Sequence, residues 1–154
     1  MQLAHNFVDA VGQIAEVNAH VPVCLFLARL PRDASAQAAR AMKQNRRYVT
    51  VSWRTFLPIV AVLWPVEKAL EFREWADATP HLPGTRGEPR SDDAMAGRWK
   101  MVTRQTVLAC VPSIVEHPDC EPSTIGRRAQ WGQDANRVAA FLAEDAADYD
   151  WSAT

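Results

Sequence analysis

VPVCLFLA (residues 21–28) is a continuous apolar run that contains β-branched residues. A run of this length without polar alternation is typical of a strand that is buried on both faces of a sheet. Residues 47–53 alternate between polar and apolar side chains, and TVLACVP (106–112) is a second short apolar run that ends at Pro112. These three segments predict the central strands of a sheet.

Helical patterns lie around these strands. The sequence predicts four helices, each with an apolar or alanine-rich face, over residues 6–18, 33–43, 66–78 and 92 to about 105. Asn6 is expected to cap the first helix. In the third helix, the residues expected to face inward are Val66, Ala69, Leu70 and Ala76. Two segments, 54–65 and 137–142, fit either a strand or a helix, and a strand is favoured in the second.

The alternation of strands and helices predicts an α/β fold with a mostly parallel sheet and flanking helices. The length of 154 residues fits one domain, residues 1–154. With 48% hydrophobic and 23% charged residues the composition is that of an ordinary globular protein. The net charge of −1 gives no general affinity for nucleic acid or for a membrane surface.

The cysteines and the apolar runs indicate the cellular compartment in which the protein is expected. There are three cysteines, an odd number without C-x-x-C spacing, which favours a reducing compartment. No signal peptide is recognisable, and the longest apolar run, residues 56–66, is too short to cross a bilayer. A cytoplasmic location without membrane association is therefore expected.

Asp92 and Asp93 open the fourth predicted helix, with Ser91 as its expected cap. A carboxylate in the first helical turn stays ionised near the positive end of the helix dipole, which suits a general base. Aspartate is also favoured at this position for helix stability alone. Spacing by itself favours that structural interpretation.

Possible ligands for a metal or a diphosphate lie in the long loops. His117 follows the third predicted strand within VEHPDC (115–120), which lacks the spacing of a zinc site. A single imidazole can complete a divalent cation site, or it can be hydrogen-bonded within a loop. Guanidinium groups suit the oxygens of a diphosphate, and the loop arginines are Arg86, Arg90, Arg127 and Arg128. A solvated surface is the alternative for each arginine.

Two further sets of residues are candidates for binding. Lys43, Arg46 and Arg47 form a basic stretch that suits phosphate, with a solvated surface as the alternative. Most of the six tryptophans fit a core, but Trp131 and Trp151 lie in polar surroundings. One of these two is therefore a candidate for stacking on a sugar or a base.

The order of five segments resembles the glycosyltransferase-like proteins of the GT-A fold found in actinobacteria and their phages. The segments are NFVDAV (6–11), PVCLFLA (22–28), RSDDAMAGRW (90–99), VPSIVEHPD (111–119) and EPSTIGRR (121–128). The resemblance implies a partial GT-A-like, Rossmann-like sheet and a nucleotide-sugar donor, with the acceptor left open. It assigns an acid–base role to Asp92 and Asp93 and a metal-binding role to His117. The implied metal is Mn²⁺ or Mg²⁺, bridging the donor diphosphate.

One part of the family's pattern is missing. The family has an aspartate-rich metal motif before the helix that starts here near Asn6, and no such motif precedes this point. We therefore expect an N-terminally truncated glycosyltransferase-like domain, active in part or inactive. The alternative is a non-catalytic binding or assembly protein on half of the scaffold. Loss of the first strands would expose an apolar sheet edge, so self-association or a partner chain is expected there. Nucleic-acid binding is the weakest option, because the total charge is near neutral.

Overall fold

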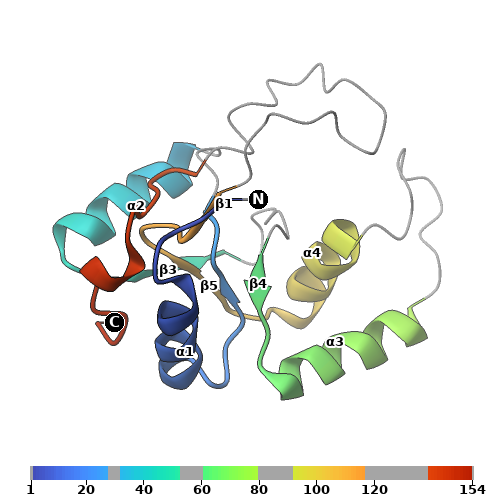
Figure 1. Cartoon of the computed structure of the whole chain (residues 1–154). Helices are drawn as coiled ribbons and strands as arrows, with labels where there is room; N and C mark the ends of the chain where they lie inside the picture. Colours follow the sequence, from blue (N-terminus) through green and yellow to red (C-terminus); the bar gives the residue numbers. More distant parts are fainter. Residues whose placement is uncertain (1, 28–31, 53–60, 80–91, 117–138, 154) are drawn as a thin grey trace.

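The computed structural model describes residues 2–27, 32–52, 61–79, 92–116 and 139–153 (Figure 1). The elements follow in the order β1 (Gln2–Leu3), α1 (Phe7–Val17), β2 (Val23–Cys24), α2 (Arg32–Lys43), β3 (Tyr48–Val51), β4 (Val62–Leu63), α3 (Val66–Ala78), α4 (Asp92–Thr103), β5 (Val107–Cys110), β6 (Val115–Glu116) and a 3₁₀ turn, η1 (Ala146–Asp148). The four predicted helices and the three predicted strands therefore all occur at their predicted places in the chain.

The predicted mostly parallel, Rossmann-like sheet is wrong for the described residues. The larger sheet has the order β3-β5-β2-β4 and is mixed. Strands β2 and β5 are parallel, whereas β3 pairs antiparallel with β5 and β4 pairs antiparallel with β2. A second sheet joins β1 and β6 in antiparallel orientation. The partial GT-A-like sheet is thus not what the structure shows. Alternation along the chain indicates that helices separate strands, but strand direction depends on which neighbours each strand finds.

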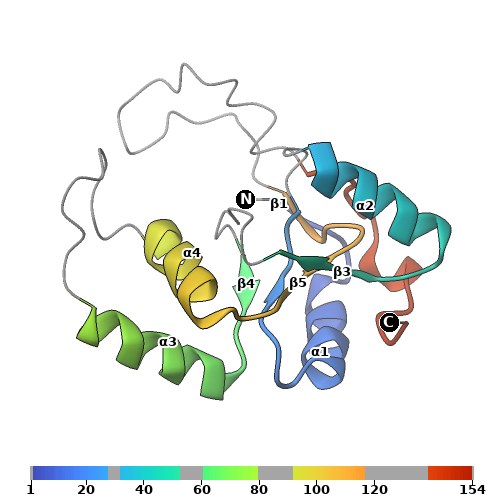
Figure 2. The ribbon, with the colours of Figure 1, turned by 180° about the vertical axis from the view of Figure 1, so that it is seen from behind.

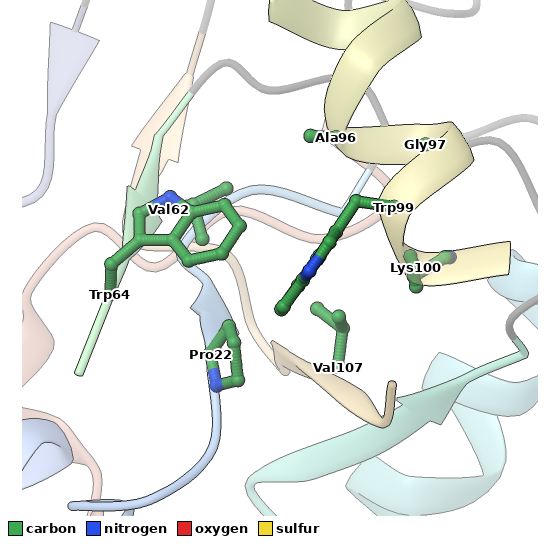
Figure 3. Close-up of a pocket in the computed structure, with 8 residues that line it drawn as sticks. All are labelled: Pro22, Val62, Trp64, Ala96, Gly97, Trp99, Lys100 and Val107. Atoms are coloured by element: carbon green, nitrogen blue, oxygen red, sulfur yellow. The ribbon is translucent and has the colours of Figure 1, made fainter. Parts of the chain in front are cut away.

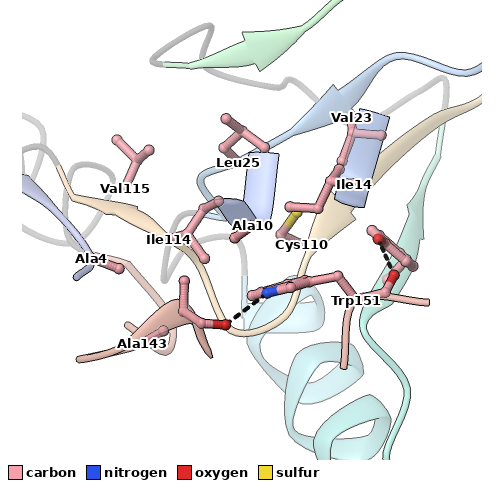
Figure 4. Close-up of a cluster of buried hydrophobic side chains, with 12 residues drawn as sticks. Ala4, Ala10, Ile14, Val23, Leu25, Cys110, Ile114, Val115, Ala143 and Trp151 are labelled. Carbon is pink, nitrogen blue, oxygen red and sulfur yellow. Dashed lines mark hydrogen bonds between the residues drawn. The ribbon is translucent and has the colours of Figure 1, made fainter. Parts of the chain in front are cut away.

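The apolar run around β2 is buried on both faces, as predicted. Val23 and Leu25 belong to one core cluster, which includes Ile14 of α1 (Figure 4). Cys24 and Phe26 belong to the other cluster, which α2 covers. Because successive side chains of a strand point to opposite faces, α1 and α2 lie on opposite sides of the larger sheet.

Strand-like hydrogen bonding continues beyond the regular part of β2. Leu25 donates its N–H to Ala61 and accepts from Ile114, and the Ala140 N–H donates to the Leu27 carbonyl. The predicted strand therefore extends in effect to residue 27. Residues 139–142, the described part of the ambiguous segment 137–142, are neither a helix nor a regular strand and make an isolated bridge between Leu142 and Ser113.

Helix α2 ends in a turn that leads directly into β3. Asn45 has a positive φ of 58°, a conformation that asparagine tolerates better than most residues. Its N–H donates to the Met42 carbonyl, and the Arg46 N–H donates to the Ala41 carbonyl. These two bonds satisfy carbonyls at the end of the helix. They also fix the backbone of Arg46 beside the first residues of β3.

Helix α3 has its predicted bounds but not its predicted inward face. Val66 is 75% exposed and Leu70 is 43% exposed, so this part of the prediction is wrong. Phe72 instead stacks on Trp64, with ring centroids 5.4 Å apart, and Trp64 lies 5.5 Å from Trp99 of α4. Aromatic rings bury more area than the aliphatic side chains on which the prediction relied. They therefore determine which side of α3 packs.

Some predicted features lie outside the described residues. These are residues 80–91 of the loop 79–91, residues 117–136 of the loop 113–136, and most of the ambiguous segment 54–65. The described end of that last segment contains β4, so a strand is confirmed there.

Candidate functional site

Helix α4 begins at Asp92, which confirms that Asp92 and Asp93 lie in a first helical turn. Their side chains lie outside the part of the molecule that the structure describes, so the general-base role stays a prediction. The same holds for His117 and for the four loop arginines predicted to bind a diphosphate, Arg86, Arg90, Arg127 and Arg128. Strand β6 ends at Glu116, the residue directly before His117.

The start of α4 and the end of β6 lie on one side of the larger sheet. Figures 1 and 2 show that the first turns of α4 and α2 and the paired strands β1 and β6 all lie at the upper edge. In open α/β sheets ligands commonly bind at the carboxyl ends of strands, and β2 also ends on this side. The first turn of α4 and Glu116, the last residue of β6, thus lie at a shared edge.

An apolar pocket lies between α4 and the sheet (Figure 3). It is lined by Pro22, Val62, Trp64, Ala96, Gly97, Trp99, Lys100 and Val107. Its volume of about 20 Å³ leaves room for roughly one water molecule. Neither a sugar nor a nucleotide fits this space as it stands. The pocket is therefore a packing feature of the aromatic cluster rather than a donor site.

Lys100 is a buried cation that the sequence analysis missed. Only 3% of its surface is exposed, and Nζ donates to the Ser52 carbonyl over 2.9 Å. Burial lowers the pKa of Lys100 to about 8. The signal was present in the sequence. Ala96, Trp99 and Lys100 are three and four residues apart, which puts the lysine on the inward face of α4.

The buried lysine predicts a pH dependence of stability. The folded pKa of about 8 lies below the ordinary value of 10.5, so between these pH values the unfolded chain binds the extra proton. The contribution of Lys100 is therefore complete above about pH 10.5 and is lost as the pH falls through about 8. Relative to Lys100→Met, the wild-type chain should become more stable from pH 7 to pH 10, as measured by urea unfolding. Lys43→Met, which removes an exposed charge, should show no such change, and parallel curves for wild type and Lys100→Met would refute the assignment.

A polar cluster of His5, Asn6 and Asp145 joins the start of α1 to the C-terminal segment. His5 Nδ1 lies 3.0 Å from Asp145 Oδ2, and Asn6 Nδ2 donates to both carboxylate oxygens. The Ala147 N–H donates to Oδ1 of the same carboxylate over 2.8 Å. Asn6 is the N-cap residue of α1, as predicted, with a φ of 55°, but its side chain makes no capping bond to the helix and donates to Asp145. Asp145 is the residue that caps a turn, at the start of η1.

These donors make Asp145 sensitive to acid. Hydrogen bonds lower the pKa of Asp145 to about 2 from an ordinary 3.8. The bond from the Ala147 N–H has the largest effect, and those from Asn6 and His5 have smaller effects. Its stabilising contribution is present above pH 3.8 and is lost as the pH falls through about 2. Asp145→Asn should lower the melting temperature at pH 7, and the difference from wild type should shrink towards pH 2. Asp148→Asn, in the same turn, is the matched control. An equal effect of both variants would contradict this role.

Within the described residues, no group of three or more histidine, cysteine, aspartate or glutamate side chains could hold a metal ion. The binding of Mn²⁺ or Mg²⁺ by His117 stays a prediction. Cys24 and Cys110 are fully buried, and burial raises the pKa of the Cys110 thiol well above its usual value. Both behave as small apolar core residues, as expected.

The structure tests one of the two tryptophans that were candidates for stacking on a ligand. Trp151 is fully buried in the core cluster beneath α1, so that role is wrong for Trp151 (Figure 4). Its polar neighbours in sequence misled the prediction, because the chain there folds back onto the sheet. Trp131 lies outside the described residues.

Comparisons with known protein families, with curated proteins and with solved structures found no match. None of the helices among the described residues is long and apolar enough to span a membrane.

Proposed function

We propose that this chain handles a nucleotide-diphosphate sugar as a glycosyltransferase-like protein, in a partial or inactive form. The observation that carries the proposal is the start of α4 at Asp92, on the side of the sheet where β6 ends before His117. The proposal does not depend on a parallel GT-A sheet, which the structure excludes for the described residues. It depends on the five segments of resemblance and on this shared edge.

The roles follow from the chemistry of the side chains. A carboxylate at the start of α4 is kept ionised by the helix dipole and is suited to accept a proton from an acceptor hydroxyl. The loop arginines predicted to bind phosphate are suited to hold a diphosphate by bidentate hydrogen bonds. When bound, a divalent ion would act as a Lewis acid on the diphosphate, with His117 as its proposed ligand.

The first test is isothermal titration with uridine, guanosine and thymidine diphosphates, with and without Mn²⁺. Binding that requires the metal and is lost in His117→Ala supports a donor site. His20→Ala, at an exposed turn after α1, is the matched control and should bind as wild type does. No binding to any of the three nucleotides would refute the proposal for this chain.

The second test separates binding from transfer. If one of the paired aspartates is the base, Asp92→Asn or Asp93→Asn should abolish sugar transfer while nucleotide binding and folding are retained. Transfer that is unchanged in both variants would remove the role from this pair.

The alternative is a non-catalytic binding or assembly protein. The mixed sheet favours it, because the strand arrangement departs from the one that the resemblance implied. It predicts no metal-dependent nucleotide binding and a stoichiometric partner on purification. A monomer by light scattering that turns over a nucleotide sugar would exclude it.

A further inference from the structure

An open groove runs along the outer edge of β3, beneath α2. Its volume is about 250 Å³. One wall is the polar stripe of α2, which we define as Gln37 and Arg40 together with Gln44 in the turn directly after the helix; these residues are three and four positions apart. The other wall is the strand itself, from Tyr48 to Thr50. This groove shares no residue with the proposed donor site.

The backbone of β3 leaves hydrogen-bonding groups directed into this groove. The Val111 N–H donates to the Arg47 carbonyl, and Val49 is paired with Ala109. In an antiparallel ladder hydrogen-bonded pairs alternate, so Val49 directs its N–H and C=O towards β5. Tyr48 and Thr50 direct theirs to the opposite side. Within the part of the chain that the structure describes, no backbone hydrogen bond satisfies these outward groups.

The open stretch ends at Ser52, whose carbonyl accepts from Lys100 Nζ over 2.9 Å. The opening therefore spans Tyr48 to Thr50. A strand of a few residues can add there through backbone hydrogen bonds to Tyr48 and Thr50, the mode by which extended peptides bind sheet edges.

The charge of the groove indicates which kind of added strand it can bind. Arg40 and Arg46 line it, Lys43 is exposed on the same helix end, and none of the lining residues that the structure describes is acidic. A second copy of this chain is disfavoured, because a two-fold β3–β3 pairing would set the same arginines against each other. An extended segment with acidic side chains meets the arginines with opposite charge.

We infer that the edge of β3 and the polar stripe of α2 form a docking site for an extended, acidic peptide of a partner protein. The peptide adds as a strand beside Tyr48–Thr50, and its carboxylates pair with Arg40 and Arg46. The two glutamines, Gln37 and Gln44, are placed to hydrogen-bond its outer backbone groups. Arg47 is not part of this recognition, because it is buried and its guanidinium lies 5.2 Å from the Tyr149 ring centroid.

The test uses the full chain and a fluorescein-labelled peptide in which glutamate alternates with threonine or valine. Fluorescence polarisation should show saturable binding. Arg40→Glu and Arg46→Glu should each weaken it at least about tenfold, whereas Arg73→Glu on the exposed side of α3 should leave it unchanged. A peptide with lysine in place of glutamate should not bind.

A backbone measurement distinguishes strand addition from simple charge attraction. Amide hydrogen exchange of Tyr48 and Thr50 in the wild-type chain should slow when the acidic peptide is saturating. Thr50→Pro, which removes one outward N–H, should weaken binding without the charge change. The inference is overturned if polyuridylate or polyphosphate binds with the same affinity as the peptide and the amide hydrogen exchange of Thr50 does not slow. It is also overturned if the edge self-associates, or if Arg40→Glu binds as wild type does.

Discussion

Trp151→Ala is expected to lower the free energy of unfolding by about 3–5 kcal/mol, the usual cost of truncating a fully buried tryptophan. The side chain is completely buried in the cluster that includes Ile14 and Cys110. Its Nε1–H donates to the Ala146 carbonyl over 2.8 Å, so the ring also holds the turn η1 in place. For a domain whose total stability is about 5–15 kcal/mol, this is a large fraction.

The measurement is urea unfolding monitored by circular dichroism, because the substitution removes a tryptophan and so changes the fluorescence signal. Tyr48→Phe is an informative partner, because the Tyr48 hydroxyl donates to the Trp151 carbonyl over 2.6 Å. That variant leaves the Trp151 carbonyl without its donor and should cost about 1–3 kcal/mol, less than the loss of the whole tryptophan. Trp75→Ala, a half-buried tryptophan on α3, should cost less than Trp151→Ala. A loss below about 1 kcal/mol for Trp151→Ala would mean that the C-terminal segment does not pack as described.

Ser113→Ala is expected to cost about 1–3 kcal/mol, because it leaves a buried backbone donor without its acceptor. Ser113 is 1% exposed, and its Oγ accepts the Leu27 N–H over 2.9 Å. Its backbone N–H donates to the Phe141 carbonyl, and its carbonyl accepts from the Ala143 N–H. One residue thus connects the end of the β2 run, the segment after β5 and the C-terminal segment.

The check is again urea unfolding, combined with hydrogen exchange at Leu27. Exchange of the Leu27 amide should accelerate in Ser113→Ala by more than the global loss of stability explains. Ser152→Ala, at the exposed C-terminal turn, is the matched control. Unchanged protection at Leu27 would refute the role of the Ser113 hydroxyl.

Some parts of the candidate site could be predicted from the sequence, and others could not. The start of α4 at Asp92 was predictable, because a serine and two aspartates before an amphipathic stretch are a local signal. The inward position of Lys100 was also detectable, because it lies four residues after Ala96 on the same face of the helix. The basic stretch Lys43, Arg46 and Arg47 was recognised in the sequence as a binding candidate, and Arg46 lines the β3 groove, but the groove itself could not be predicted. It depends on α2 covering one face of a strand that happens to lie at the edge of the sheet.

Local sequence patterns were sufficient to predict the four helices and the three strands β2, β3 and β5. They did not predict β1, β6 or the turn η1. The signals of the predicted elements are local: the apolar run around Val23, the alternation of residues 47–53, and the helical periodicity of residues 66–78. The tertiary structure decided the directions of β3 and β4, the packing side of α3 and the burial of Trp151. Strand direction and burial depend on contacts between residues far apart in the chain, and the free energy of those contacts is set by shape and area that periodicity does not encode.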